Sequence, residues 1–403
     1  MNNHFINIRL GEIGKVSMCK RILKNQTSET EKVPFYKIST FGSKADTFIS
    51  FELYSEYKKK YSYPKKGDIL ISASGTIGKT VIFNGEDSYF QDSNIVWIDN
   101  DELAIINKYL YYFYQINSWT STNGSTIKRL YNDDLRNIII HYPNIYTQQK
   151  IAKVLSTLDA KIELNNRINK ELEAMAKTLY DYWFVQFDFP HANNKPYKSS
   201  GGKMIYNEEL KREIPEDWEV DSLWNIANFF NGLAMQKHRP TNENYLRVIK
   251  IREMNEGFSD GTEFASADVP KEAIIENGDI LFSWSATLDV KMWSNGKGAL
   301  NQHIFKVTSD KYPKVFYFFE LLNYLQHFKM MANLRKTTMG HITQEHLKQS
   351  KIVIPPMTLI ENIDKKINPI FEKKLLLEQE TQHLTQLRDF LLPMLMNGQA
   401  RVT

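Results

Sequence analysis

Apolar residues recur with helical spacing in two long segments of the chain. A 4-3 spacing of apolar positions predicts helices that pack as a coiled coil. Asn165 and Asn169 interrupt the first series, and Lys374, Thr381 and Arg388 interrupt the second, so we expect seams with polar centres. The first apolar series is Ile151, Leu155, Leu158, Ile162, Leu172, Ala176, Leu179 and Trp183. The second is Ile363, Ile367, Ile370, Leu377, Leu384 and Leu391.

Capping residues predict where each long helix begins. Asn is a strong N-cap and Pro is tolerated at the first helical position, so Asn368-Pro369 predicts that a short helix ends and a long one starts there. Ser156 supplies the matching N-cap 212 residues earlier. Each long helix would then have about 28 residues and a length of about 40 Å. An antiparallel pair would bury both stripes and place a globular segment at each end; alternatively, each helix packs on its own globular segment.

Short runs of β-forming residues precede each helical segment, and Gly, Asn, Asp and Ser turns separate them. The runs are Asp68–Ile71, Val81–Phe83 and Asn94–Ile98 in the first half, and Asp279–Phe282 and His303–Val307 in the second. Together with the helices, they predict a mixed α/β fold class. We expect two α/β globules separated by two long helices that form an antiparallel coiled coil.

The two halves of the chain match each other, and such repeats identify duplicated folds. Gly67–Ser72 recurs as Gly278–Ser283, and Leu135–Ile140 matches Leu347–Ile352. The further matches are Leu10–Ile13 with Leu223–Ile226, Asp92–Ile95 with Asn301–Ile304, and Tyr111–Phe113 with Tyr317–Phe319. All five keep their order at offsets of 206 to 213 residues, which favours a pseudo-two-fold duplication over chance similarity. The predicted parts are globular segments 1–145 and 215–356, helical regions 146–188 and 357–403, and a linker at 189–214.

Composition narrows the class of protein. Lys and Arg total 51 and Asp and Glu total 47, a net charge of +4 over 403 residues, so any nucleic-acid-binding face must be local. The single cysteine, Cys19, excludes an intrachain disulfide and a Cys-based zinc site. Apolar runs stay shorter than a membrane span, and Met1–His4 lacks the layout of a signal peptide, so we expect a cytoplasmic protein without membrane association.

The segment Ala73–Thr80 has features of a phosphate-binding loop, because it follows an apolar strand and ends in Gly-Lys-Thr. A nucleotide-binding loop must open a helix, however, and Val81–Gly85 favours a strand and a turn. The corresponding segment Trp284–Val290 lacks the glycines and the lysine. A P-loop NTPase is therefore the weakest hypothesis, and the segment is interpreted as a DNA-contacting turn or a plain hairpin.

Residue spacing gives no support for catalysis. His341 and His346 are five residues apart, the wrong helical phase for joint metal ligation. Asp133-Asp134 and Glu171–Glu173 are predicted to lie on solvated helical surfaces. The sequence also lacks an Asn-Pro-Pro-Tyr motif and a glycine-rich loop for a methyl donor. We predict a non-catalytic chain that binds neither a metal nor a cofactor.

Loop residues supply the candidate DNA contacts. Lys58–Lys60 favours a solvated lysine face, whereas Lys128-Arg129 and Arg335-Lys336 occupy equivalent positions before a turn, which favours phosphate contacts. The candidates in the first half are Ser74, Thr76, Lys79, Asn94, Lys128 and Arg129. Those in the second half are Ser285, Thr287, His303, Arg335, Lys336 and Thr337.

The succession of globular segment, helix, globular segment and helix resembles the specificity subunits of type I restriction-modification enzymes over nearly the entire chain. The runs that carry this resemblance are Gly67–Leu70, Gln148–Ala152, Ile162–Asn169, Tyr182–Val185 and Leu391–Gly398. The start of the second helical region, Thr358–Asn362, lacks the paired glutamines present at Gln148-Gln149.

The resemblance implies that each globular segment is a target-recognition domain that reads one half of a split double-stranded DNA sequence. It implies that the seam helices form a spacer and dock two modification subunits, and that restriction subunits join them. A rod of about 40 Å is close to the ~34–36 Å of one DNA turn. S-adenosylmethionine, ATP and Mg are expected on the partner subunits, with no cofactor on this chain. The alternative from another class is a coiled-coil scaffold without sequence-specific DNA binding.

Overall fold

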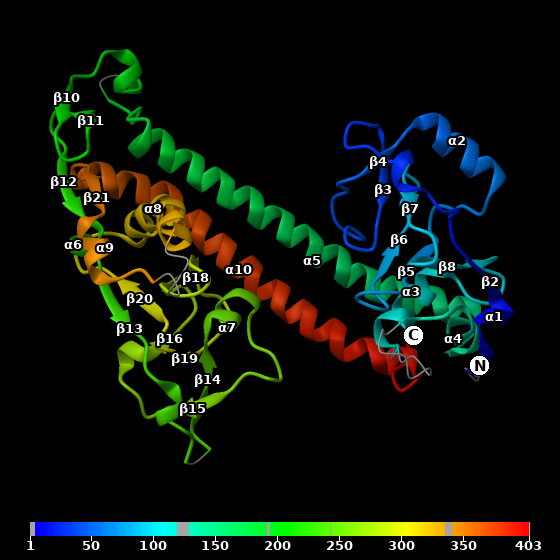
Figure 1. The fold of residues 1–403 in the computed structure, drawn as a ribbon. Helices are drawn as coiled ribbons and strands as arrows, with labels where there is room; N and C mark the ends of the chain where they lie inside the picture. Colours follow the sequence, from blue (N-terminus) through cyan, green and yellow to red (C-terminus); the bar gives the residue numbers. More distant parts are fainter. Residues whose placement is uncertain are drawn as a thin grey trace. The chain divides into compact units, whose positions relative to one another are not determined.

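The computed structural model describes residues 5–117, 119, 129–191, 194–241, 243–334 and 341–402. The chain divides into two compact units. The first unit comprises residues 1–161 together with 384–403, and the second comprises residues 162–383. The first unit therefore includes the C-terminal stretch of the chain as well as the N-terminal globular segment (Figure 1).

The first unit contains a four-stranded antiparallel sheet in the order β2-β8-β5-β6. A smaller sheet has the order β4-β3-β7, in which β3 and β7 run parallel, and β1 pairs with β9. Its strands are β1 Ile6–Arg9, β2 Gly14–Ser17, β3 Val33–Tyr36, β4 Phe48–Ile49, β5 Ile69–Ser72, β6 Thr80–Ile82, β7 Tyr89–Phe90, β8 Ile95–Asn100 and β9 Ile139–Tyr142. Its helices are α1 Leu10–Ile13, η1 Lys24–Gln26, α2 Phe51–Lys60, α3 Asn107–Ile116 and α4 Asn132–Asn137.

The second unit repeats this plan. Its larger sheet has the order β13-β20-β17-β18, its smaller sheet β15-β14-β19-β16, and β12 pairs with β21. The strands are β12 Glu219–Ser222, β13 Asn228–Asn231, β14 Tyr245–Ile249, β15 Phe264–Ser266, β16 Ile274–Ile275, β17 Ile280–Ser283, β18 Asp289–Met292, β19 Gly298–Leu300, β20 Ile304–Thr308 and β21 Lys351–Ile354. The helices are α6 Leu223–Ile226, η5 Met235–Lys237, α7 Ile251–Glu256, η6 Lys271–Ala273, α8 Lys314–Leu334 and α9 Gln344–Gln349.

The predicted strands are confirmed to within two residues at each end. Four of them form the inner strands of the two larger sheets, where runs such as Ile69–Ser72 and Ile280–Ser283 are buried along their whole length, whereas Val81–Phe83 corresponds to the edge strand β6. The same strand order in both units confirms the duplication. The α/β fold class is confirmed as well.

The two long helices are longer than the capping residues predicted. Helix α5 runs from Ile145 to Tyr180 and α10 from Met357 to Met396, 36 and 40 residues, and a π-helical turn, η2 (Asp181–Val185), follows α5. The predicted starts at Ser156 and Asn368 are wrong. Ser156 Oγ donates to the carbonyl oxygen of Lys153, and Asn368 Nδ2 donates to Glu372 Oε1, both within continuous helix.

Burial explains why the proline does not end helix α10. A proline inside a helix costs about 3 kcal/mol. Ile360, Ile363 and Ile367 are fully buried on one face of the same helix, and each buried isoleucine contributes roughly 1.5–3 kcal/mol. Their packing outweighs the backbone hydrogen bond that Pro369 cannot make.

Within each unit, α5 and α10 pack against each other in antiparallel directions. In the second unit Asn165 Nδ2 donates to Glu380 Oε2 at 2.8 Å, and Lys374 lies 3.8 Å from Glu173. The seam residues face inward as predicted, either buried or half-buried. The buried ones are Ile151, Leu155, Ile363, Ile367 and Leu377. The half-buried ones are Leu158, Ile162, Leu172, Leu179, Ile370, Leu384 and Leu391.

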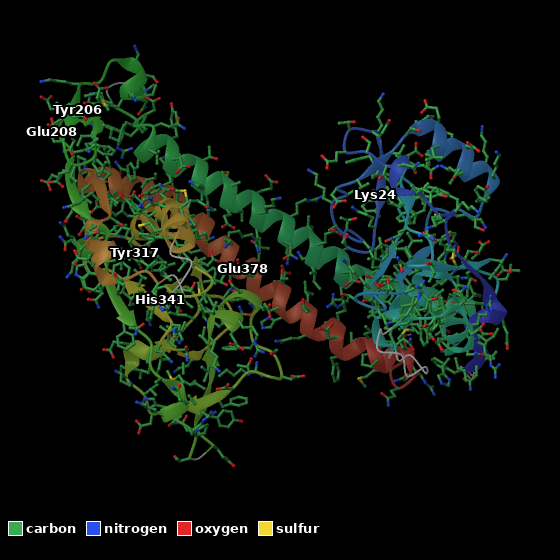
Figure 2. All side chains as sticks on the ribbon, in the orientation of Figure 1. Lys24, Tyr206, Glu208, Tyr317, His341 and Glu378 are labelled. Atoms are coloured by element: carbon green, nitrogen blue, oxygen red, sulfur yellow. The ribbon has the colours of Figure 1, made fainter. Side chains whose placement is uncertain are left out.

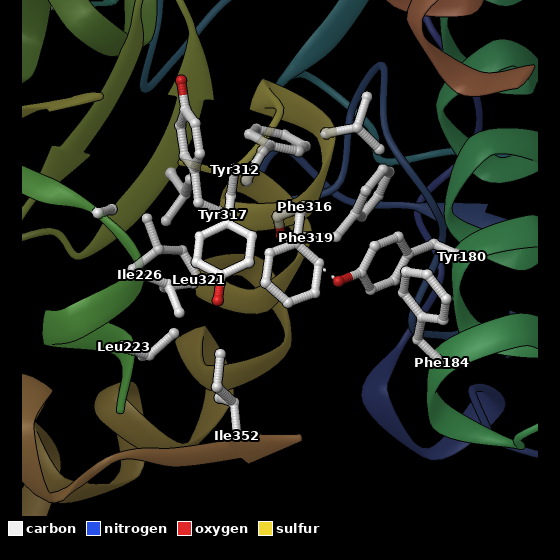
Figure 3. Close-up of a cluster of buried hydrophobic side chains, with 14 of the residues drawn as sticks. Tyr180, Phe184, Leu223, Ile226, Tyr312, Phe316, Tyr317, Phe319, Leu321 and Ile352 are labelled. Carbon is white, nitrogen blue, oxygen red and sulfur yellow. Dashed lines mark hydrogen bonds between the residues drawn. The ribbon is translucent and has the colours of Figure 1, made fainter. Parts of the chain in front are cut away.

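The seam residues also pack on the globular parts, so the two predicted arrangements of the helices coexist. In the second unit Tyr180 of α5 stacks on Phe319 of α8 at a centroid distance of 4.7 Å (Figure 3). The Tyr180 hydroxyl donates to Glu320 Oε1 at 2.6 Å. Ile363 and Ile367 of α10 belong to the same cluster. In the first unit Ile151 and Leu155 pack with Leu392 and Leu395.

Part of the predicted linker forms regular secondary structure. Strands β10 (Met204–Asn207) and β11 (Arg212–Pro215) form an antiparallel hairpin after the short η4 turn (Lys198–Ser200). Ile214 is buried against Trp218, whereas Tyr206 and Glu208 are exposed (Figure 2). Across the described ranges, the helices lack a segment long and apolar enough to cross a membrane.

Candidate nucleic-acid interface

The loop between β5 and β6 carries the first group of predicted residues. Ser72 Oγ donates to the carbonyl oxygen of Thr76 and accepts from the backbone N–H of Lys79 at 2.9 Å. Gly75 has a φ of +65°, a left-handed conformation that glycine adopts without strain. The single buried hydroxyl of Ser72 therefore holds this loop closed through the backbone of Thr76 and Lys79. The Thr76 side chain is exposed.

The loop between β17 and β18 in the second unit is closed in the same way. Ser283 Oγ donates to the carbonyl oxygen of Thr287 at 2.5 Å and accepts from the N–H of Asp289 at 2.8 Å. Ala286 occupies the position of Gly75 with a φ of +55°, unusual for a residue with a Cβ. Thr287 is exposed like Thr76. The loop fold is thus retained although its glycines are not.

A second serine in each loop holds the residue that precedes strand β8 or β20. Ser74 Oγ donates to Asn94 Oδ1 at 2.9 Å, and Ser285 Oγ lies 3.2 Å from His303 Nδ1. The backbone N–H of Ala73 bonds to the Asn94 carbonyl oxygen, and that of Trp284 bonds to the His303 carbonyl oxygen. Four residues predicted as DNA contacts therefore form two equivalent pairs.

A third segment completes each cluster. Leu130 N–H donates to the Ala73 carbonyl oxygen in the first unit, and Ile342 N–H donates to the Trp284 carbonyl oxygen in the second, both at 2.9 Å. The preceding residues, Arg129 and His341, are therefore equivalent, so the predicted equivalence of Lys128-Arg129 with Arg335-Lys336 is wrong. Lys128, Arg335, Lys336 and Thr337 lie outside the described residues.

The chemistry at these equivalent positions differs between the units. In the first unit Arg129 Nη2 donates to the carbonyl oxygen of Ser93 at 2.9 Å, which holds its guanidinium beside Asn94. In the second, the Trp284 ring lies 5.7 Å from the His303 ring and 5.5 Å from the His341 ring. One cluster is thus an amide with a fixed cation, and the other is an indole between two imidazoles.

A groove of about 740 Å³ opens beside Asn94 in the first unit. Its charged lining is Arg21, Lys24, Lys37, Arg129, Glu29 and Asp92, four cations against two carboxylates. Lys37 also pairs with Asp46 at 2.9 Å, and this hydrogen bond lowers the pKa of the Asp46 carboxyl. Arg21 and Lys24 are exposed, and Figure 2 marks Lys24 on the first unit. A polar, basic groove of this kind suits a phosphate backbone.

Sequence reasoning missed Arg21, Lys24 and Lys37, which pack near Asn94 through the pairing of strands far apart in the chain. Parallel pairing of β3 with β7 joins Tyr36 to Phe90, and β2 pairs with β8. The basic pair Lys20-Arg21 followed by Lys24 was the signal available in the sequence.

Lys79 does not form a nucleotide site. The residues after it form strand β6, as predicted, where a phosphate-binding loop would open a helix. Lys79 Nζ donates to the carbonyl oxygen of Phe41 at 2.5 Å. This bond fixes the ammonium group against the neighbouring loop.

Other charged clusters are structural. Lys58 and Lys60 lie in the last turn of α2, where Lys60 pairs with Glu56, which fits a solvated helix end. Asp133 pairs with Arg136 on the surface of α4. In the ranges that the structure describes, three or more His, Cys, Asp or Glu side chains nowhere gather in a way that could hold a metal ion.

Comparison with known proteins identifies the family. A family model described as the type I restriction modification DNA specificity domain matches residues 3–174 and again residues 215–386. The chain belongs to this specificity-domain family. The two matches begin 212 residues apart, the offset seen in the sequence repeat.

Relatives and a solved structure agree with membership of the specificity-domain family. Over 179 residues the chain is 56% identical to a Haemophilus influenzae protein named as a type I restriction enzyme specificity subunit. The match spans 44% of this chain and 46% of that protein, which is under half the length of each. A type I restriction enzyme specificity subunit from Methanocaldococcus jannaschii is 28% identical over 356 residues, 84% of this chain and 78% of that protein.

The fold resembles that of the S subunit of a type I restriction-modification system from M. genitalium. The TM-score is 0.61 at 15% identity, and the match covers 98% of this chain and 96% of that chain. The specificity-domain fold is therefore shared despite low sequence identity.

The long helices of this specificity-domain protein also expose apolar residues at repeated positions. Leu164 and Met175 on α5 are 38% and 53% exposed, and Leu376 and Leu387 on α10 are 60% and 45% exposed. Each α10 residue lies 212 positions after its α5 counterpart. These outward positions were not predicted, although the 212-residue offset would have paired them.

Proposed function

We propose that the chain is the non-catalytic DNA-recognition subunit of a type I restriction-modification complex. Residues 1–145 and 215–356 are the two target-recognition domains, and each reads one half of a split double-stranded target. One observation carries this proposal: the two units have the same backbone hydrogen bonds around these loops but hold different side chains at the equivalent positions, Asn94 with Arg129 and His303 with His341. Different side chains on one scaffold suit two different half-sites.

Charge distribution supports DNA as the ligand. The net charge of +4 is small, but four cations line the groove beside Asn94. Phosphate neutralisation supplies most sequence-independent affinity, and side chains at the groove floor can then meet base edges. In this proposal Thr76 and Thr287 contact the backbone from the loop tips. Lys79 serves mainly to fix its loop, because its ammonium is bound to Phe41.

The helices α5 and α10 are proposed to set the distance between the half-sites and to dock two modification subunits. The support is the exposed apolar pair on each helix, Leu164 with Met175 and Leu376 with Leu387, because equivalent exposed apolar positions suit two copies of one partner. S-adenosylmethionine would be bound by those partners, and ATP and Mg by restriction subunits. The complex would act in the cytoplasm.

Domain exchange tests this function. Residues 218–355 are replaced with the corresponding domain of another family member, and the chain is assembled with modification subunits. Methylated sites in genomic DNA are then mapped. We expect the half-site read by the second domain to change while the other half-site is retained. Exchange of residues 1–145 in the same way is the matched control and should change the other half-site. Two unchanged half-sites in both exchanges would refute the proposal.

A further inference from the structure

Two serines hold the side chains at equivalent fold positions in an equivalent way. Ser74 Oγ donates to Asn94 Oδ1 at 2.9 Å, and Ser285 Oγ lies 3.2 Å from His303 Nδ1. Ser285 is 4% exposed, and its Oγ forms one hydrogen bond with His303 Nδ1 in which either atom can be the donor. From the geometry shared with Ser74 and Asn94, we assign the Ser285 hydroxyl as the donor and His303 Nδ1 as the acceptor.

This bonding leaves one nitrogen donor on each side chain. Asn94 Nδ2 forms no hydrogen bond with the described part of the chain, and Asn94 lines the basic groove. When Nδ1 of a neutral imidazole accepts a hydrogen bond, the proton is carried by Nε2. His303 is exposed, so its Nε2–H is available to a ligand. Both units thus present an N–H donor from the residue that precedes a central strand.

The chemistry of base edges indicates what these donors would meet. In the major groove a purine offers N7 as an acceptor, and adenine adds an N6 donor, which an asparagine amide can match with both of its atoms. Asn94 Oδ1 retains one lone pair beside the one that Ser74 uses, so it can accept from N6 while Nδ2 donates to N7. The single Nε2 donor of His303 matches purine N7.

We propose that Asn94 and His303 are the equivalent base-reading residues of the two domains, Asn94 for an adenine and His303 for a purine. Ser74 and Ser285 are positioning residues, since they orient these side chains and fix which atom faces outward. Arg129, held beside Asn94 by the Ser93 carbonyl oxygen, would bind the adjoining phosphate. This inference rests on the proposed function.

The first test replaces the donor on one side chain. Asn94→Asp keeps the size and the acceptor for Ser74 but removes the Nδ2 donor. Asn84→Asp is the matched control, because Asn84 is an exposed asparagine on the turn after β6, where its Oδ1 accepts from Glu86 N–H. The full chain is assembled with modification subunits, and methylated sites in genomic DNA are mapped.

We expect Asn94→Asp to lower discrimination at one adenine position of one half-site by roughly 5- to 100-fold, the value of a good bidentate contact. The other half-site should be unchanged, and Asn84→Asp should match the unmodified chain. His303→Asn should change one purine position of the second half-site, with His327→Asn, an exposed histidine on α8, as its control. Unaltered half-sites in Asn94→Asp and His303→Asn would overturn the proposal.

If Asn94→Asp abolishes methylation, DNA binding is measured instead. The assembled complex selects duplexes from a randomised DNA library, and the base preference at each position is determined. Loss of preference at a single base position supports the proposal, and equal weakening for all duplexes overturns it. Ser74→Ala should lower preference at the same position as Asn94→Asp while total binding is retained. Domain exchange distinguishes failure of this assignment from failure of the proposed function. If domain exchange changes a half-site but these substitutions change none, only the base-reading assignment is wrong.

Discussion

Asp159 on α5 accepts a hydrogen bond from Arg388 on α10, with 3.0 Å between Oδ1 and Nη1. Its other oxygen accepts from the Tyr112 hydroxyl of α3 at 2.6 Å. Both side chains of the ion pair are about one-third exposed, and all three residues belong to the first unit. One carboxylate therefore joins both long helices to the globular part of that unit.

Asp159→Ala should lower the free energy of unfolding of the first unit by about 2 kcal/mol, because hydrogen bonds to a charged group contribute about 1.5–3 kcal/mol. Hydrogen–deuterium exchange should show faster exchange in α3 and in residues 145–161. Asp133→Ala is the control, since Asp133 pairs with Arg136 at 2.7 Å with its side chain 82% exposed. Equal exchange rates in the two variants would contradict the assigned role of Asp159.

The polar centre of the seam should be replaceable by apolar residues. Asn169 is buried, and its Oδ1 is without a hydrogen-bond partner in the part of the chain that the structure describes. A buried unpaired polar group costs about 1–3 kcal/mol, so Asn169→Leu should raise the melting temperature of the full chain. Asn165→Leu should raise the melting temperature by less, because it also removes the 2.8 Å hydrogen bond to Glu380. A larger gain from Asn165→Leu would contradict this account.

The carboxyl group of Glu320 should make the second unit less stable as pH rises. Burial raises its pKa from 4.5 to about 7, although the Tyr180 hydroxyl and the charge of Arg212 oppose the shift. Between pH 4.5 and 7 the folded chain holds a proton that the unfolded chain releases, so stability falls through this window and then levels off.

Glu320→Gln keeps an oxygen that accepts from Tyr180 but cannot ionise. We expect a flatter melting-temperature profile from pH 4.5 to 7, and a gain of about 1–2 kcal/mol at pH 8 after allowance for solvent screening. Glu208→Gln, at an exposed hairpin position, should leave the profile unchanged. A Glu320→Gln profile that parallels the unmodified chain would show that Glu320 does not titrate in this range.

Charge on the outward helix faces should prevent partner binding without unfolding the chain. Leu164→Glu and Leu376→Glu together should reduce copurification of modification subunits by roughly 10-fold or more, as expected for central apolar contacts of an interface. Leu103→Glu makes the same change at an 81% exposed position of the first globular segment and should have no effect. Unchanged copurification in the double variant would exclude these faces as docking sites.

Helix length should control the gap between half-sites. Seven residues inserted after Arg167 in α5 and after Gln379 in α10 keep the seam register and add about 10.5 Å to each helix. A base pair rises about 3.4 Å, so the gap in the recognised DNA should grow by about three base pairs. The measurement is a methylation map of the inserted variant, and an unchanged gap would argue against a spacer role.

Local patterns in the sequence predicted the strands and the seam, because each depends on residues close together in the chain, whereas the duplication was predicted from matching segments 206 to 213 residues apart. Ile69–Ser72 and Ile280–Ser283 are recognisable strands since every side chain is buried. The capping argument failed at Asn368-Pro369 because packing of Ile363 and Ile367 overrides a local preference. The groove was missed because Arg21 and Lys24 reach Asn94 through strand pairing that no local pattern encodes.

The buried hydroxyls of Ser72 and Ser283 close their loops through hydrogen bonds to backbone atoms of the loop. These bonds do not involve the side chains of Thr76 and Thr287 at the loop tips. The backbone of each loop therefore does not depend on which residues stand at its exposed positions, as Ala286 in the place of Gly75 illustrates. Substitutions at the tips can accumulate one at a time, in nature or in the laboratory, without refolding of the domain. The same loop backbone can therefore carry different side chains at Thr76 and Thr287.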